Sequence, residues 1–279
     1  MTNKEWALEL VKQFDDRWEP GVWPHIERED LAQSLRDRLN DPDSLNQGNT
    51  NLCGVAAFVR DWLQDDPVGY VWLAICLFER GVGSLSRKGS GARVIRPSQE
   101  LKNSILANVL DRNTSRPMAS ADWIVMASLR EDLDLSLNYR ADEGWLFWSD
   151  IRGLSSVGDV VNLFKHAGYQ DVRDYANWWV RYSANHLEMA GRYVAAGYKV
   201  VLFIDYRLLR QDQQDTEALV ATANHFVGLT SPITFDPSRQ SLTFDVFNYG
   251  NIQPVPEGGG WMPAKTLERH YYGFVAAKF

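Results

Sequence analysis

The sequence predicts an α+β fold in which a mostly helical N-terminal part precedes an antiparallel sheet. Helical patterns with capping signals fill the first two-thirds of the 279 residues. Apolar, β-rich runs bounded by turn signals fill the last third. Helices followed by strands, rather than alternating with them, are typical of α+β proteins. With 45% hydrophobic residues, the chain can bury a substantial core.

The helical pattern divides into eight segments. We expect helices near residues 4–17, 29–39, 53–64, 68–80, 98–110, 120–130, 156–167 and 178–196. Thr2 and Glu5 have the spacing of a capping box, in which each residue satisfies a free backbone N–H of the other. Further N-terminal capping signals are Asp30, Ser98, Ser120 and Ser156.

Three strand regions follow. We expect a strand over residues 198–205, a hairpin whose two strands flank the turn at 236–239, and a closing strand over 271–279. If the middle of the turn lies between Asp236 and Pro237, His225 faces Asn248 across the hairpin. Asp245 has the opposite parity on its strand and would point to the other face of the sheet.

Composition excludes several classes of protein. A net charge of −7 argues against general affinity for nucleic acid or for anionic membranes, because both need clustered basic residues. No apolar run approaches the 18 residues of a membrane span, and the N-terminus does not resemble a cleaved signal peptide. We therefore expect no membrane insertion, a cytoplasmic location in the producing cell, and export only without a cleaved signal.

Cys53 and Cys76 are the only two cysteines. They form no disulfide framework, which suits a reducing cytoplasm, and two thiols are too few for a typical structural zinc site. Cys76 lies within an apolar helical pattern and is expected to be a packed thiol. The histidines show no metal-ligand spacing, so the sequence predicts no metal and no cofactor.

The segment at residues 46–54, NQGNTNLCG, contains the most informative residues. Cys53 opens an apolar helical run, and the N-terminus of a helix favours the thiolate because free N–H groups and the helix dipole attract negative charge. Gln47 precedes it by six residues, and its amide can donate a hydrogen bond to an oxyanion that develops beside the sulfur. Gln47 and Cys53 together therefore supply two requirements of acyl transfer.

This segment resembles the active-site segment of papain-like cysteine proteases. The Asn46-Gln47-Gly48 triplet stands six residues before Cys53, and a later hairpin has an Asn224-His225 pair and Asn248 ahead of Tyr249-Gly250. The resemblance implies a nucleophilic Cys53, an oxyanion-binding Gln47, His225 as general base and Asn248 as the residue that orients the imidazole. Asp245 is the alternative third member.

The resemblance also implies a domain plan and a biological setting. Residues 1–45 would be an N-terminal helical extension, and residues 46–279 a papain-like catalytic domain with its helical part at about 46–196 and its sheet at about 197–279. The cysteine helix would pack against the sheet. The segments at residues 122–124, 128–130, 198–205, 224–232 and 271–275 look like those of bacterial papain-like effector or toxin domains. Such proteins are commonly delivered by a secretion machine and accompanied by an immunity protein.

The expected activity is cleavage of an amide or peptide bond in a protein or peptide-like substrate through a Cys-His-Asn(Asp) triad. Deamidation and acyl transfer to an amine use the same apparatus, so they remain open. A non-catalytic papain-like module that binds a partner protein is the alternative from another class. The reactivity of Cys53 distinguishes these classes.

Overall fold

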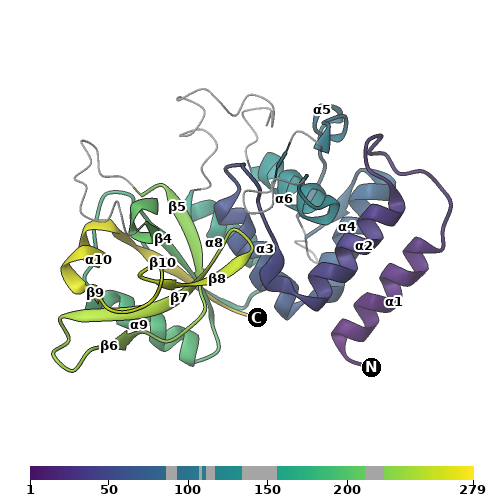
Figure 1. The fold of residues 1–279 in the computed structure, drawn as a ribbon. Helices are drawn as coiled ribbons and strands as arrows, with labels where there is room; N and C mark the ends of the chain where they lie inside the picture. The colour runs from purple at the N-terminus through teal and green to yellow at the C-terminus, as the bar shows by residue number, and fades with distance from the viewer. Residues whose placement is uncertain (86–92, 107–108, 111–116, 134–155, 211–222) are drawn as a thin grey trace. The chain divides into compact units, whose positions relative to one another are not determined.

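The computed structural model describes residues 1–85, 93–106, 109–110, 117–133, 156–210 and 223–279, and it confirms the α+β class (Figure 1). The chain forms two compact units, Met1–Ser155 with His166–Gly168, and Ser156–Lys165 with Tyr169–Phe279. Residues 1–45, the predicted N-terminal extension, lie in the first unit. The second unit begins before the sheet and contains most of residues 156–196, whose two helices the sequence assigned to the helical part.

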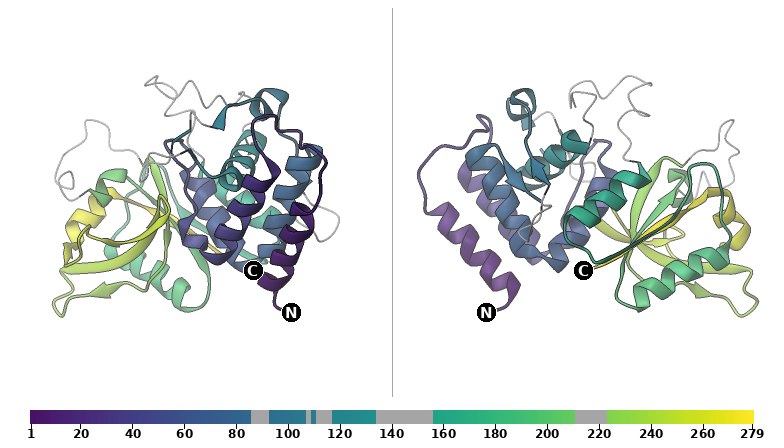
Figure 2. Two further views of the ribbon diagram at one scale, coloured as in Figure 1. Left: turned by 45° about the vertical axis from the view of Figure 1, so that its right-hand side comes forward. Right: turned by 180° about the vertical axis from the view of Figure 1, so that it is seen from behind.

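The first unit is built mainly from helices. They are α1 (Asn3–Asp15), α2 (Arg28–Asn40), α3 (Cys53–Asp65), α4 (Pro67–Arg80), α5 (Gln99–Lys102) and α6 (Ser120–Leu133), with a short 3-10 helix, η1 (Pro42–Ser44). A small antiparallel pair, β1 (Gly83–Ser84) and β2 (Val94–Ile95), accompanies them. Helix α1 packs against α2 and α4, and α6 packs against α2, α3 and α4 (Figure 2).

Capping residues fix where these helices begin and end. Thr2 and Glu5 form the predicted capping box, so α1 begins where the sequence indicates. Asp66 caps α4 by accepting the Gly69 backbone N–H, and Pro67 occupies the first helical turn. Gly81 ends α4 in the left-handed conformation at φ 64°, which costs glycine little because it has no Cβ.

The prediction of one helix over residues 98–110 is wrong. Ser98 does cap a helix, but α5 ends at Lys102, and Asn103 is its C-cap. The Ser104 hydroxyl donates to the Leu101 carbonyl at 2.7 Å. Serine and asparagine side chains offer the backbone such alternatives to helical hydrogen bonds, and they explain the early end.

The second unit contains an eight-stranded antiparallel sheet. The strands β3 (Asp171–Ala176), β10 (Tyr271–Lys278), β4 (Lys199–Ile204), β5 (His225–Leu229), β7 (Ser241–Asn248) and β6 (Thr234–Phe235) follow one another in that order, and β8 (Asn251–Val255) and β9 (Met262–Pro263) pair with β7. The predicted strands at 198–205 and 271–279 are confirmed within a residue or so. Strand β3 was not predicted, because as a half-exposed edge strand it carries few apolar residues.

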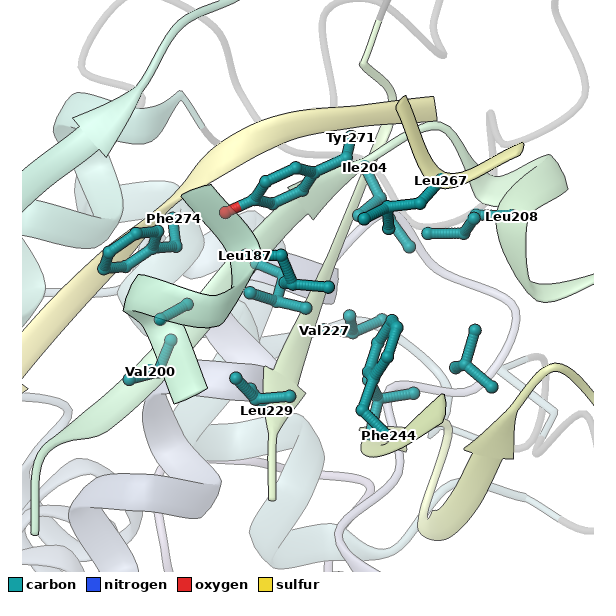
Figure 3. Close-up of a cluster of buried hydrophobic side chains, with 14 of the residues drawn as sticks. Leu187, Val200, Ile204, Leu208, Val227, Leu229, Phe244, Leu267, Tyr271 and Phe274 are labelled. Carbon is teal, nitrogen blue, oxygen red and sulfur yellow. The ribbon is translucent and has the colours of Figure 1, made fainter. Parts of the chain in front are cut away.

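Helices α8 (Val157–His166), α9 (Ala184–Ala195) and α10 (Ala264–His270) and the 3-10 helix η4 (Tyr206–Leu209) complete the described secondary structure. Helix α9 is shorter than the expected 178–196, since the Tyr182 backbone N–H donates to the Tyr271 carbonyl instead of entering a helix. Side chains of α9, α10, η4 and the sheet form one core cluster (Figure 3). Leu187 of α9 lies among Val200 and Ile204 of β4 and Val227 of β5 in this cluster.

The hairpin forms, but its register differs from the one predicted. Phe235 pairs with Leu242, so the turn is centred between Ser238 and Arg239, two residues later than expected. Farther along, Gly228 pairs with Phe247, and continuing this register places Val227 opposite Asn248. His225 instead pairs with Ile204 of β4. Because the shift is an even number of residues, His225 and Asn248 still lie on the same face of the sheet.

Candidate functional site

Cys53 is the first residue of α3, as the sequence predicted. The helix is almost entirely buried over residues 53–63, and Cys53 itself is 4% exposed. Its first turn contains no acidic residue, so no side chain of that turn opposes the attraction of the helix N-terminus for a thiolate. The chemical environment of Cys53 therefore differs from that of Cys76 in the interior of α4, where burial raises the pKa of the thiol.

Gln47 lies in a loop held by its own hydrogen bonds. Its Nε2 donates to the Thr50 carbonyl at 3.0 Å, and the Thr50 hydroxyl donates back to the Gln47 carbonyl. Gly48 has φ 62°, and a Cβ at this position would lie 2.8 Å from the Leu110 carbonyl oxygen. Glycine is thus required here both by the left-handed backbone and by the close approach of Leu110.

His225 and Asn248 form a buried hydrogen-bonded pair in the second unit. His225 Nε2 lies 2.8 Å from Asn248 Oδ1, and the two residues are 4% and 8% exposed. Because a carboxamide oxygen only accepts, Nε2 carries the hydrogen, and in the neutral imidazole Nδ1 has the lone pair. This is the tautomer in which Nδ1 can take a proton, and Asn248 fixes both the tautomer and the plane of the ring.

Asp245, the alternative partner, occupies a different place on β7. Its carbonyl accepts the Thr230 backbone N–H at 3.0 Å, and its own N–H donates to the Ser231 hydroxyl at 2.7 Å. The strand parity that separates it from Asn248 is retained in the structure. Of the two candidates, Asn248 is the one that contacts the imidazole.

Two tyrosine rings lie against His225. Tyr249 stacks on the imidazole with the ring centroids 5.5 Å apart and the planes at 19°, and Tyr206 meets it edge to face at 5.1 Å. Tyr249 and Gly250 form the two-residue turn between β7 and β8, with φ 47° and 76°. Positive φ at both positions matches a type I′ hairpin turn, and tyrosine adopts it with strain.

The four predicted site residues thus divide between the two units. Gln47 and Cys53 lie in the first unit, and His225 and Asn248 in the second. Within the second unit, the structure brings together the pair that the sequence predicted. Within the first, Gln47 lies in the loop that leads into the helix beginning at Cys53.

Among the residues that the structure describes, no three His, Cys, Asp or Glu side chains are placed to hold a metal ion. Two cavities of about 490 and 500 Å³ occur in the first unit, one lined by residues such as Trp18 and Arg28, the other by Trp6 and Trp72. Neither is lined by a predicted site residue. No described helix has the length and apolarity needed to span a membrane.

Comparisons with protein-family models, with curated proteins and with solved structures find no match to this chain. The residues themselves therefore provide the argument for function.

Sequence reasoning did not assign roles to several residues that support the site. Tyr206 was not singled out, because nothing in the sequence brings η4 beside His225. The buried ion pair of Arg38 with Asp122 was also missed. One signal in the sequence could have pointed to this pair. Asp122 lies in the first turn of an apolar helix, and a carboxylate that is buried there needs a charged partner.

Proposed function

We propose that this chain is a cysteine hydrolase of papain-like type that cleaves an amide or peptide bond. The hydrogen bond between His225 and Asn248 is the observation that carries the proposal. A buried histidine held in one tautomer by a neutral amide is the arrangement that a general base requires. The position of Cys53 at the N-terminus of a buried helix adds the second component.

In the proposed mechanism, His225 takes the proton of Cys53, and the thiolate attacks the carbonyl carbon of the substrate. The Gln47 amide and the Cys53 backbone N–H stabilise the resulting oxyanion. The His225 imidazolium then protonates the leaving amine, which leaves an acyl group on the sulfur. Water, activated by His225, releases this acyl group and restores the thiol.

Deamidation of a glutamine side chain follows the same steps with ammonia as the leaving group, and acyl transfer replaces water with an amine. The proposal therefore specifies a papain-like cysteine enzyme. Which of these reactions it catalyses depends on the substrate. A non-catalytic module that binds a partner protein would need neither a reactive Cys53 nor an oriented His225.

We further propose a bacterial effector or toxin that acts on a protein or peptide-like substrate after delivery, with an immunity protein in the producer. The experiment is expression of the wild type, Cys53→Ala and Cys76→Ala in a bacterial cytoplasm and, with an added export signal, in its periplasm. We expect toxicity in one compartment that Cys53→Ala abolishes and Cys76→Ala retains. Equal toxicity of wild type and Cys53→Ala would refute catalysis by this thiol.

A further inference from the structure

A buried ion pair anchors the loop that contains Gln47. Arg38 of α2 holds both oxygens of Asp122 of α6, with Nε 2.8 Å from Oδ1 and Nη2 2.7 Å from Oδ2. Asp122 is 0% exposed. Burial lowers the pKa of Arg38, but the charge and hydrogen bonds of Asp122 more than offset this effect and raise it. A carboxylate with no exposure is costly unless it is paired and hydrogen-bonded.

The same carboxylate also holds the backbone beside Gln47. The Asn46 backbone N–H donates to Asp122 Oδ2 at 3.0 Å, and the Asn46 side-chain Oδ1 accepts the Gly48 backbone N–H at 2.8 Å. Both neighbours of Gln47 in the chain are therefore fixed by hydrogen bonds that depend on Asn46. Arg38 adds a further contact, because its Nη1 donates to the Ser44 hydroxyl just upstream of the loop.

We propose that Asp122 is a positioning residue for Gln47, an inference that rests on the proposed oxyanion role of Gln47. Asp122 fixes the Asn46–Gly48 backbone, and this backbone determines where the Gln47 amide points. One of the two amide hydrogens is used by the Thr50 carbonyl. The second is the donor for the oxyanion.

A charged anchor suits this task. Hydrogen bonds that a backbone N–H donates to a carboxylate are stronger than those to a neutral acceptor. An oxyanion donor is effective when it needs no reorganisation during the reaction, so a rigid loop raises the reaction rate without a direct contact between Asp122 and the substrate. Asp122→Asn keeps the size of the side chain but weakens its hold on Arg38 and Asn46.

Two reactions of Cys53 separate this role from a merely structural one. Iodoacetamide alkylates the thiolate by displacing iodide, and no oxyanion forms. With p-nitrophenyl acetate, the thiolate adds to the ester carbonyl to give a tetrahedral oxyanion, which expels p-nitrophenolate and leaves a thioester on the sulfur. Mass spectrometry measures alkylation and acetylation of Cys53, and Cys53→Ala provides the background.

We expect Gln47→Ala and Asp122→Asn each to slow acetylation about tenfold or more while alkylation stays within about twofold of wild type. Glu79→Gln is the matched control, because Glu79 forms a largely buried ion pair with Arg28 in the same unit, away from the loop. Its two rates should both resemble those of wild type. Circular dichroism checks that each variant folds.

If Asp122→Asn fails to fold, the double substitution of Arg38→Met and Asp122→Leu takes its place, because apolar replacement of a whole buried ion pair is often tolerated. The same selective loss of acetylation is expected. If Asp122→Asn or the double variant is acetylated at the wild-type rate while Gln47→Ala is acetylated slowly, the positioning role of Asp122 is overturned and the proposed function stands. Wild-type acetylation in Gln47→Ala overturns the oxyanion role of Gln47 and the inference with it. If wild-type Cys53 is alkylated but never acetylated, the proposed function itself fails.

Discussion

Asn248 Oδ1 accepts a hydrogen bond from His225 Nε2 across 2.8 Å, although the two residues do not face each other in the sheet register. Strand β7 ends at Asn248, and the strained Tyr249-Gly250 turn follows at once. A side chain at a strand end can reach diagonally to a neighbour two residues along, because residues of the same parity share a face. The contact thus depends on strand parity and on this turn.

Loss of the Asn248 amide should impair catalysis more than stability. We expect Asn248→Ala to lower turnover tenfold or more, because His225 loses the partner that fixes its tautomer and ring plane. Asp245→Asn should change turnover little, because its side chain has the opposite strand parity and its hydrogen bonds to Thr230 and Ser231 use the backbone, which the substitution keeps. Steady-state kinetics on the two variants test this assignment, and a severe loss in Asp245→Asn alone would reverse it.

The sequence predicted the elements of the site better than their register. Cys53 begins its helix as expected because an apolar run after a polar loop defines the start of a buried helix. The hairpin register shifted because Asp245 donates its backbone N–H to the Ser231 side chain, and the segment between Leu229 and Thr234 carries two extra residues. Such side-chain contacts have no periodic signal in a sequence.

Two contacts could not be predicted from the sequence for another reason: the Arg38–Asp122 ion pair and the contact of Tyr206 with His225. Asp122 contacts a residue 84 positions earlier in the chain. Tyr206 reaches His225 from a short 3-10 helix after β4. Neither contact follows from a strand register or a helical period. Both depend on tertiary packing, which a single sequence does not reveal. By contrast, the pairing of Asn248 with His225 needed only strand parity and an approximate turn position.

Gly48 should be intolerant of any side chain. Gly48→Ala combines a positive φ with a contact of 2.8 Å to the Leu110 carbonyl oxygen, so we expect a loss of about 2–3 kcal/mol in the free energy of unfolding. Gly259→Ala is the matched control, because Gly259 has φ 85° with no atom within 4 Å. It should lose only about 1 kcal/mol, the cost of the backbone conformation.

Urea denaturation measures both variants. Equal losses would show that the Leu110 contact relaxes without cost.

Asp205 should make the stability of the protein sensitive to acid. Burial raises the pKa of Asp205, but His270 and Arg207 more than offset this and hold it well below its usual value. The unfolded chain therefore binds more protons than the folded one in acid, so stability falls as pH decreases below the unfolded pKa of about 4. Asp205→Asn should cost roughly 3 kcal/mol near neutral pH because Arg207 and His270 lose a buried partner.

The difference in unfolding free energy between wild type and Asp205→Asn should shrink steadily from pH 5 to pH 2. Urea titrations at several pH values measure it. A difference that stays constant over this range would mean that the charge of Asp205 does not contribute.

The central claim is that Cys53 and His225 act as one catalytic pair, and the most direct measurement is the rate of Cys53 alkylation by iodoacetamide at pH 6. An imidazolium partner keeps the thiol ionised at this pH, whereas an isolated thiol with its usual pKa near 8.5 is almost fully protonated. We predict rapid, selective alkylation of Cys53 in the wild type, little labelling of Cys76, and a rate at least tenfold lower in His225→Ala. Equal rates in the wild type and His225→Ala would contradict the account.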